Sequence, residues 1–329
     1  MDITDRMTVT RLLSSGAFMM SLALIVALST NLLGVFPDEV LTTDVRSNTT
    51  ILVLAVMLTI SLSRIPIANL NPMKHWKSML RAVLLGLVIS SIIPLLGYYL
   101  LKGLDVENME FYATGLVFIA ATPFAASVMP LSIIQGGDPE HAARGTIIVY
   151  IAALLWIPFI IWLTLKDYVD MKSVVITVVE IIGIPLILSR LFTKIKIPKE
   201  VLAVFLNCCI FLLVWMSVGA TKFPSEIAVL LAFGLVAALR SFGLGNVLEV
   251  AESKAGISWA QRVTDILMAS YKNKGIAITL CVALMGPNTP LAMVAIATSI
   301  VVEICWVIFM DAVLFSKSRH ERVCGKTDS

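Results

Sequence analysis

Charged residues are scarce in this sequence: Asp, Glu, Lys and Arg make up 14% of its 329 residues, whereas 58% are hydrophobic. A soluble globular domain usually carries about 25% charged residues. A chain of this length in water could not cover so much apolar surface with so few polar side chains. The shortage of charge therefore argues against a soluble protein and favours an exterior that faces lipid.

Cysteine and histidine are also few, at five and three residues. The cysteines are odd in number and form no CxxC pair, so neither a disulfide framework nor a zinc site is expected. His75, His141 and His320 lie in polar connections without the spacing of metal ligands. We expect no metal site and no cofactor.

Catalytic motifs are absent. The sequence contains no HExxH, GxSxG or Walker A stretch, and no polar loop is long enough to form a catalytic domain. We therefore do not expect an enzyme or an ATP-driven transporter, with a membrane-embedded enzyme or scaffold kept as an alternative.

Long apolar runs make up most of the chain. A helix needs about 20 predominantly apolar residues to cross the hydrocarbon core of a bilayer. The windows that meet this requirement are Gly16–Phe36, Ser47–Ser63, Met79–Leu101, Phe111–Ile134, Gly145–Leu165, Val174–Leu191, Val201–Ala220, Pro224–Ser241, Thr264–Met285 and Pro290–Phe315.

The lysines and arginines indicate the orientation, because basic residues are retained on the cytoplasmic side. With both termini in the cytoplasm, 18 basic residues, Arg240 among them, lie in cytoplasmic segments or span ends, and 5 lie in outer loops. Lys272 and Lys274 lie within a span. This asymmetry predicts ten spans with both termini cytoplasmic, in a multi-pass protein of the plasma membrane.

Ten spans divide into two repeats of five, residues 1–165 and 166–329. A tandem copy of an odd-numbered unit inserts upside down, and inverted repeats of this kind are a common transporter plan with the site near the midplane. Spans four and nine then correspond to each other. We predict an all-α integral membrane protein of two inverted five-helix repeats, in which spans four and nine are discontinuous.

Span four reads GLVFIAATPFAASVMPLSIIQGGD. Pro123 and Pro130 each remove a backbone donor, so the helix is expected to kink or unwind between them. Backbone groups freed in this way are tolerated at membrane depth only where protein or a wet cavity satisfies them. Thr122 and Ser127 add short polar groups to this stretch. A simple proline kink is the alternative.

Span nine reads TDILMASYKNKGIAITLCVALM, with a polar stretch from Ser270 to Gly275 between two apolar half-helices. A charged residue at the bilayer centre costs roughly 2.5–3.5 kcal/mol on insertion scales. Lys272 and Lys274, on either side of Asn273, would therefore not persist facing lipid. Gly275 would supply the backbone freedom for a break. The alternative is a loop between two interfacial helices.

Glu303 lies near the middle of span ten. Intramembrane acids usually pair with a base or mark an ion path. Because spans nine and ten are consecutive and antiparallel, Glu303 is the expected counter-charge of Lys272 and Lys274.

Three short stretches resemble the bile acid:sodium symporter (BASS) family of ten-helix transporters. They are SSIIPLLGYYL in span three, GLVFIAATPFAASVMP followed by QGGD in span four, and YKNKGIA in span nine. The resemblance implies a panel domain of spans one, two, six and seven, and a core domain of spans three to five and eight to ten, in which spans four and nine cross. It also implies an organic anion bound between the domains and two sodium ions behind the crossing.

The chain departs from the family pattern where sodium ligands are expected. Carboxylate and amide oxygens are lost and an ammonium is gained, which makes coupling to two sodium ions doubtful. The replacements are Ile89 before Pro94 where the family has Gln, Ser127-Val128 where it has Ser-Asn, and Met268 and Lys272 before Asn273-Lys274-Gly275 where it has Glu and Gln before Asn-Ser-Gly.

The leading hypothesis is a secondary transporter that moves a small organic anion by alternating access, with a proton or no coupling ion. An ammonium at the crossing could replace the ion as a fixed charge, or it could titrate. A proton-coupled or uniport carrier of the auxin-efflux or arsenite-efflux type is the alternative. We expect the lipid bilayer as a partner and no nucleic acid. The candidate site residues are Thr122, Pro123, Ser127, Pro130, Ser270, Lys272, Asn273, Lys274, Gly275 and Glu303.

Overall fold

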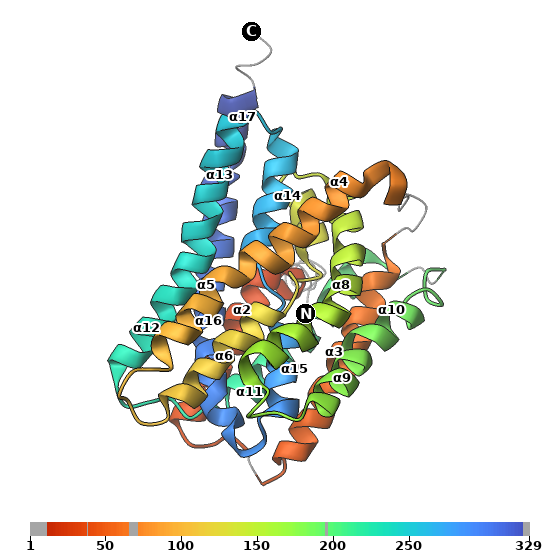
Figure 1. Ribbon diagram of the computed structural model, residues 1–329. Helices are drawn as coiled ribbons and strands as arrows, with labels where there is room; N and C mark the ends of the chain where they lie inside the picture. The colour runs from red at the N-terminus through yellow and green to blue at the C-terminus, as the bar shows by residue number, and fades with distance from the viewer. Residues whose placement is uncertain (1–11, 38, 66–71, 195–196, 325–329) are drawn as a thin grey trace, which may run out of the picture.

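The computed structural model describes residues 12–37, 39–65, 72–194 and 197–324, and within these ranges the chain is helical with no β-strand (Figure 1). Arg6, Arg11, Lys196 and Lys326, which the orientation argument uses, lie outside the described residues. The helices are α2 (Gly16–Leu32), α3 (Thr43–Ser63), α4 (Pro72–Val83), η2 (Leu84–Ile89), α5 (Ser90–Leu101), α6 (Met109–Ala121), α7 (Val128–Ile134), α8 (Pro139–Leu165), α9 (Met171–Val178), η3 (Val179–Gly183), α10 (Ile184–Leu188), α11 (Lys199–Val218), α12 (Ile227–Ala238), η4 (Leu239–Gly243), α13 (Leu244–Lys254), α14 (Trp259–Ser270), α15 (Lys274–Leu284), η5 (Gly286–Asn288), α16 (Thr289–Phe309), η6 (Met310–Leu314) and α17 (Lys317–Cys324).

Seven helical runs in the described part of the chain are long and apolar enough to cross a membrane: Asp44–Ser63, His75–Leu101, Pro139–Leu165, Met171–Leu188, Glu200–Val218, Ile227–Lys254 and Gly286–Leu314. Three shorter apolar helices, Phe18–Leu32, Met109–Ala121 and Lys274–Leu284, fall in the first, fourth and ninth predicted windows. The ten-span count therefore stays a prediction, because these three are too short to be assigned by length alone.

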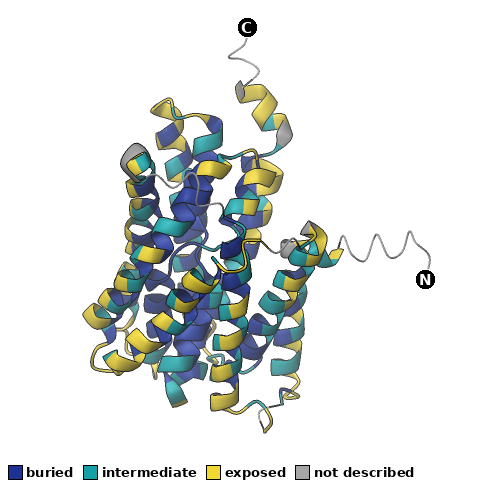
Figure 2. Ribbon diagram, turned by 90° about the vertical axis from the view of Figure 1, so that its right-hand side faces the viewer, coloured by how far each residue is buried: buried dark blue, intermediate teal, exposed yellow. Residues whose placement is uncertain are grey.

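The exterior of the bundle is apolar. Leu155 is 79% exposed, Leu100 and Ile187 are each 73% exposed, and the buried residues concentrate in the interior (Figure 2). A soluble monomer rarely presents such broad apolar surface. Contact with lipid explains this apolar exterior, as the composition predicts.

Two groups of helices pack side by side. In one, α2 lies against α11, and α3 lies against α10 and η3. In the other, α6 packs between α5 and α16, α16 contacts α12, and α4 lies along α8. Helix α15 packs against α6 and α16 of the second group and also contacts α3 of the first, which joins the two groups.

Three long helical runs of the described chain contain a π-helical turn near their middle, η2, η3 and η4, and two of these turns reach the site. At the end of η2, the Ser90 amide donates to the Leu85 carbonyl instead of its α-helical acceptor, the Gly86 carbonyl. At the end of η4, the Leu244 amide donates to the Leu239 carbonyl. Such turns are rare and frequently lie at functional sites. Here η2 and η4 contribute Gly86 and Arg240 to the site described below.

The predicted end of span eight is wrong. The window ended at Ser241, with Arg240 at a cytoplasmic end, but the helical run continues from Ile227 to Lys254. Arg240 therefore lies inside this run and is 1% exposed. The charge of Arg240 ended the predicted apolar window, although buried hydrogen-bond acceptors accommodate the arginine inside the bundle.

Candidate functional site

The first helix break lies between α6 and α7. Thr122 follows α6 with extended backbone angles (φ −75°, ψ 151°), and α7 begins at Val128. Pro123 has no amide hydrogen to continue the α6 hydrogen-bond pattern. Thr122 and Pro123 are buried, which leaves their carbonyl oxygens in the interior, where they need donors.

The second break lies between α14 and α15. Tyr271 ends α14 with extended backbone angles (φ −119°, ψ 92°). Asn273 caps α15, because its Oδ1 accepts a hydrogen bond of 3.0 Å from the Ile276 amide. The structure thus starts a new helix at Lys274.

The two breaks bind each other through their backbones. Phe124 and Lys272 form an isolated antiparallel bridge. In it the Ala125 amide donates to the Tyr271 carbonyl at 3.0 Å, and the Asn273 amide donates to the Pro123 carbonyl at 2.9 Å. Each break therefore satisfies backbone groups that the other leaves open, which is the requirement for irregular backbone inside an apolar bundle.

Lys272 points into a cage of oxygens. Its Nζ donates to the carbonyls of Thr122, Ala120 and Gly86 at 2.6, 3.1 and 3.3 Å, and lies 3.3 Å from Ser91 Oγ. The residue is 1% exposed. None of these partners carries a charge, so an ammonium in this cage is surrounded by dipoles, as a bound monovalent cation would be.

Lys274 lies in a different environment, beside Glu303. Its Nζ is 2.9 Å from Glu303 Oε1, which also accepts from Arg240 Nη2 and, at 3.4 Å, from the Lys272 amide. Arg240 Nη1 further donates to the Ser270 carbonyl at 2.8 Å, at the end of α14. The expected contact between Glu303 and a lysine of span nine is therefore present for Lys274, with Arg240 as a second partner.

Two further contacts hold the ends of the second break. Asn273 Nδ2 donates to the Tyr150 hydroxyl at 2.7 Å, and this hydroxyl donates to the Phe124 carbonyl at 3.2 Å. On the other side, Trp306 Nε1 donates to Ser270 Oγ at 2.8 Å. The break is thus attached to α8 and α16.

Basic groups outnumber acidic groups at the breaks. Arg240 and Lys274 pair with the carboxylate of Glu303, whereas the Nζ of Lys272 contacts neutral oxygens, and all four residues are largely buried. Burying charge is unfavourable unless partners compensate it. An anion is the ligand class that would complete such a cluster.

Two predicted site residues, Pro130 and Gly275, take other places. Pro130 lies in the first turn of α7 and is exposed, where a missing amide donor is tolerated. Ser127 precedes α7 without a side-chain cap hydrogen bond, and its side chain is hydrogen-bonded to that of Tyr271 at the second break. Gly275 is not a point of backbone freedom, because it is a helical residue of α15. A Cβ there would lie 3.0 Å from Leu54 Cδ1, so this glycine permits close packing against α3. The other candidates, Thr122, Pro123, Ser270, Lys272, Asn273, Lys274 and Glu303, lie together at the paired breaks.

Residues that the sequence did not single out complete the site: Gly86, Ser91, Tyr150, Arg240 and Trp306. The one available signal was the arginine inside an apolar run. No group of His, Cys, Asp or Glu suited to a metal ion occurs among the described residues.

Seven helical runs long enough to cross a bilayer, an apolar exterior and two paired helix breaks define an integral, multi-pass membrane protein. Residues 49–249 match the model of the sodium bile acid symporter family, which is more than half of the chain, so the protein belongs to this family. Members of the family are transporters and not enzymes, and they act on small solutes from within the lipid bilayer. A search of curated proteins found no match.

Proposed function

We propose that this protein is a secondary transporter built from ten transmembrane helices in two inverted five-helix repeats. In this arrangement α6–α7 and α14–α15 are the discontinuous spans four and nine, which cross at the bridge between Phe124 and Lys272. Two π-helical turns that reach the paired breaks, η2 and η4, support it, because they fall in spans three and eight, which an inverted repeat relates to each other.

The proposed core domain consists of spans three to five and eight to ten, and the panel domain of spans one, two, six and seven. The two groups of packed helices support this division. Alternating access would then move the panel against the core around the paired breaks. With both termini in the cytoplasm, cysteines placed at positions 196 and 222 should label from opposite sides of the membrane, and labelling from the same side would contradict the ten-span arrangement.

The proposed substrate is a small organic anion. The excess of basic groups at the breaks supports this class, and the N-terminus of α15 adds partial positive charge at the same place. The anion would compensate the excess charge reversibly, which gives the protein a reason to keep an otherwise costly cluster.

The sodium ions of the family do not fit this site. The observation that carries this step is the ammonium of Lys272 among four neutral oxygens, because it fills a cage that would otherwise suit a cation. Family carboxylate and amide positions are also occupied by Met268, Val128 and Ile89. We infer that the amino group of Lys272 takes the place of a bound cation at the crossing.

Uptake into proteoliposomes tests the proposal. A radiolabelled bile acid and a series of small carboxylates would be assayed in sodium, potassium and choline buffers of equal ionic strength. We expect uptake of at least one anion with equal rates in the three buffers, and its loss in Lys272→Met and Lys274→Met proteins that still insert and fold. Sodium-dependent uptake, or unchanged uptake in both variants, would overturn the proposal.

A further inference from the structure

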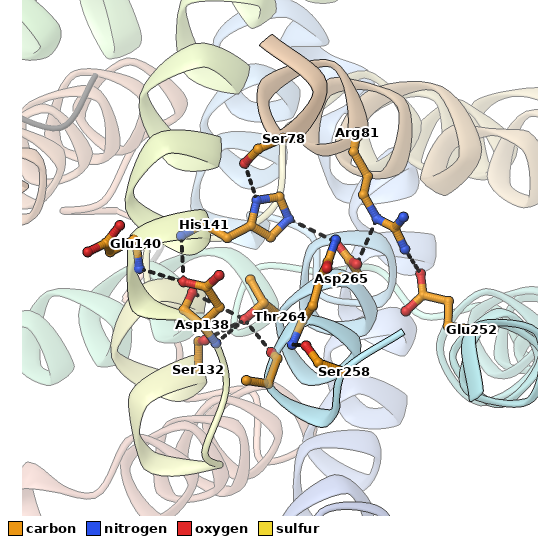
Figure 3. A network of polar contacts seen from close by, with 12 residues as sticks. Ser78, Arg81, Ser132, Asp138, Glu140, His141, Glu252, Ser258, Thr264 and Asp265 are labelled. Carbon is orange, nitrogen blue, oxygen red and sulfur yellow. Dashed lines mark hydrogen bonds and ion pairs between the residues drawn. The ribbon is translucent and has the colours of Figure 1, made fainter. Parts of the chain in front are cut away.

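A second group of titratable residues lies outside the paired breaks, where α4, α8, α13 and α14 meet (Figure 3). Its centre is Asp265, which is fully buried in α14. His141 Nε2 is 2.9 Å from Asp265 Oδ1, and Arg81 Nε is 2.7 Å from Asp265 Oδ2. The carboxylate therefore has a basic partner on each oxygen.

The other residues around His141 and Arg81 complete the group. Arg81 Nη2 also pairs with Glu252 of α13 at 2.6 Å, and Ser78 Oγ lies 2.6 Å from His141 Nδ1. Other charged groups lie nearby: Arg144 pairs with Glu140 on α8, and Arg262 and Arg319 share the carboxylate of Glu249.

The charge of this group depends on proton binding. With Asp265 and Glu252 both ionised, the group carries two negative charges and the one positive charge of Arg81, so protonation of the His141 imidazole makes it neutral; Glu252 is the other group that could take up a proton here. Histidine is the side chain whose ordinary charge change falls between pH 5 and 8. Because both ring nitrogens have partners, each protonation state is satisfied.

The Ser78 hydroxyl allows His141 to gain and lose a proton. With neutral His141, the Nε2 hydrogen faces Asp265 and the Ser78 hydroxyl donates to Nδ1; with charged His141, Nδ1 donates to the Ser78 oxygen. A proton can therefore arrive at Nδ1 from water without moving either residue. Ser78 is half-buried and the Arg81 side chain is 32% exposed, whereas His141 is 2% exposed, so the α4 side is the more accessible side of the group.

The local fold positions His141 for this role. Asp138 caps α8, because its Oδ1 accepts from the amides of Glu140 and His141 at 2.9 Å each. The Asp138 amide in turn lies 2.8 Å from Thr264 Oγ1 and 3.0 Å from the Ala260 carbonyl, both in α14. The histidine is thus held against the helix that carries Asp265.

We propose that His141 and Asp265 form a proton-binding site, with Ser78 as its link to water, and that this proton replaces sodium as the ion coupled to transport. Helix α14 connects the two places, since it carries Asp265 and ends at Ser270 beside the Lys272 break. A ligand shifts a conformational equilibrium only by binding its states differently. Proton binding to His141 would shift the equilibrium by changing the attraction between α8, which carries His141, and α14, which carries Asp265. The coupling rests on the proposed function, whereas proton binding does not.

The binding step is tested on the full-length protein in detergent with isotope-labelled histidine, whose imidazole signals are followed by NMR from pH 5 to 9. We expect reversible protonation of His141 despite its burial. In Asp265→Asn, half-protonation should need at least a tenfold higher proton concentration, because the carboxylate is lost. His75 and His320 are internal controls that should titrate identically in both proteins. If Asp265→Asn does not fold, Ser78→Ala should shift the His141 transition in the same comparison.

The coupling step is tested in proteoliposomes with the anion found in the uptake assay. A pH gradient should drive its accumulation by the wild type and not by His141→Gln, which keeps a donor for Asp265 but cannot titrate. His141 that does not titrate would overturn the site. Titration with gradient-driven accumulation intact in His141→Gln would overturn the coupling alone. Absence of any anion uptake would contradict the proposed function and leave the titration result standing.

Discussion

The two buried charge clusters in this protein lie at different places along α14 and have opposite excess charge. The paired breaks combine Arg240, Lys272 and Lys274 with Glu303 alone. The second cluster combines Asp265 and Glu252 with Arg81 and a titratable histidine. One is therefore suited to an anion and the other to a proton.

The clusters also differ in how they tolerate the loss of a partner. Glu303 is 3% exposed and is the carboxylate shared by Arg240 and Lys274. At the second cluster Arg81 is one-third exposed and has two carboxylates. Charged groups that share one buried partner depend on it strongly, whereas a partly hydrated arginine with two partners does not.

The largest effect is expected for Glu303→Gln. Removing one partner of a buried ion pair costs about 3–5 kcal/mol, because it leaves uncompensated charge. Here two cations lose the same carboxylate, so the unfolding free energy of the detergent-solubilised protein should fall by about this amount. Glu226→Gln, at an exposed position, is the control and should change it by less than about 0.5 kcal/mol. Equal stability of the two variants would remove the central role given to Glu303.

A smaller effect is expected where α4–α5 packs against the first break. A Cβ at Gly86 would lie 2.6 Å from Phe124 Cδ1, and the Phe124 backbone pairs with Lys272. Overpacking of this kind costs typically about 1–3 kcal/mol. Gly86→Ala should lower the unfolding free energy by that amount, whereas Gly103→Ala, with nothing within 4 Å, should not. A silent Gly86→Ala would show that the two segments are not closely packed.

The smallest effect is expected for Glu252→Gln in the second cluster. Arg81 keeps Asp265 and is one-third exposed, so the unfolding free energy should fall by about 1 kcal/mol or less. Chemical denaturation of this variant beside Glu303→Gln measures the contrast directly. A loss as large as that of Glu303→Gln would mean that the two clusters tolerate charge in the same way.

Much of the helical architecture follows from the sequence, because the length of each apolar run can be read directly from the order of the residues. The family resemblance also rested on short stretches that the family match now supports for residues 49–249. The breaks were anticipated because proline and paired lysines are poor helix-interior residues in lipid. The place of Pro130 in α7 does not follow from the sequence, because a proline is compatible with the first turn of a helix and the sequence does not say which turn it occupies.

The partners at the breaks could not be predicted, because they come from distant segments. The cage around Lys272 consists mostly of backbone carbonyls, which every residue has, so no side-chain pattern indicates it. Arg240 was placed at a membrane surface because a hydropathy window treats any arginine as an end. Its burial depends on Ser270 and Glu303, which only the fold brings within reach.

The replacement of a bound cation by Lys272 is tested most directly by sodium-dependent stability. Thermal unfolding of purified wild type and Lys272→Ala would be followed in increasing sodium chloride, with choline chloride keeping the ionic strength constant. We predict no sodium-dependent rise in the wild-type midpoint, and a saturable rise in Lys272→Ala, because the freed oxygens can then hold a sodium ion. A saturable rise in the wild type, or none in Lys272→Ala, would contradict the account.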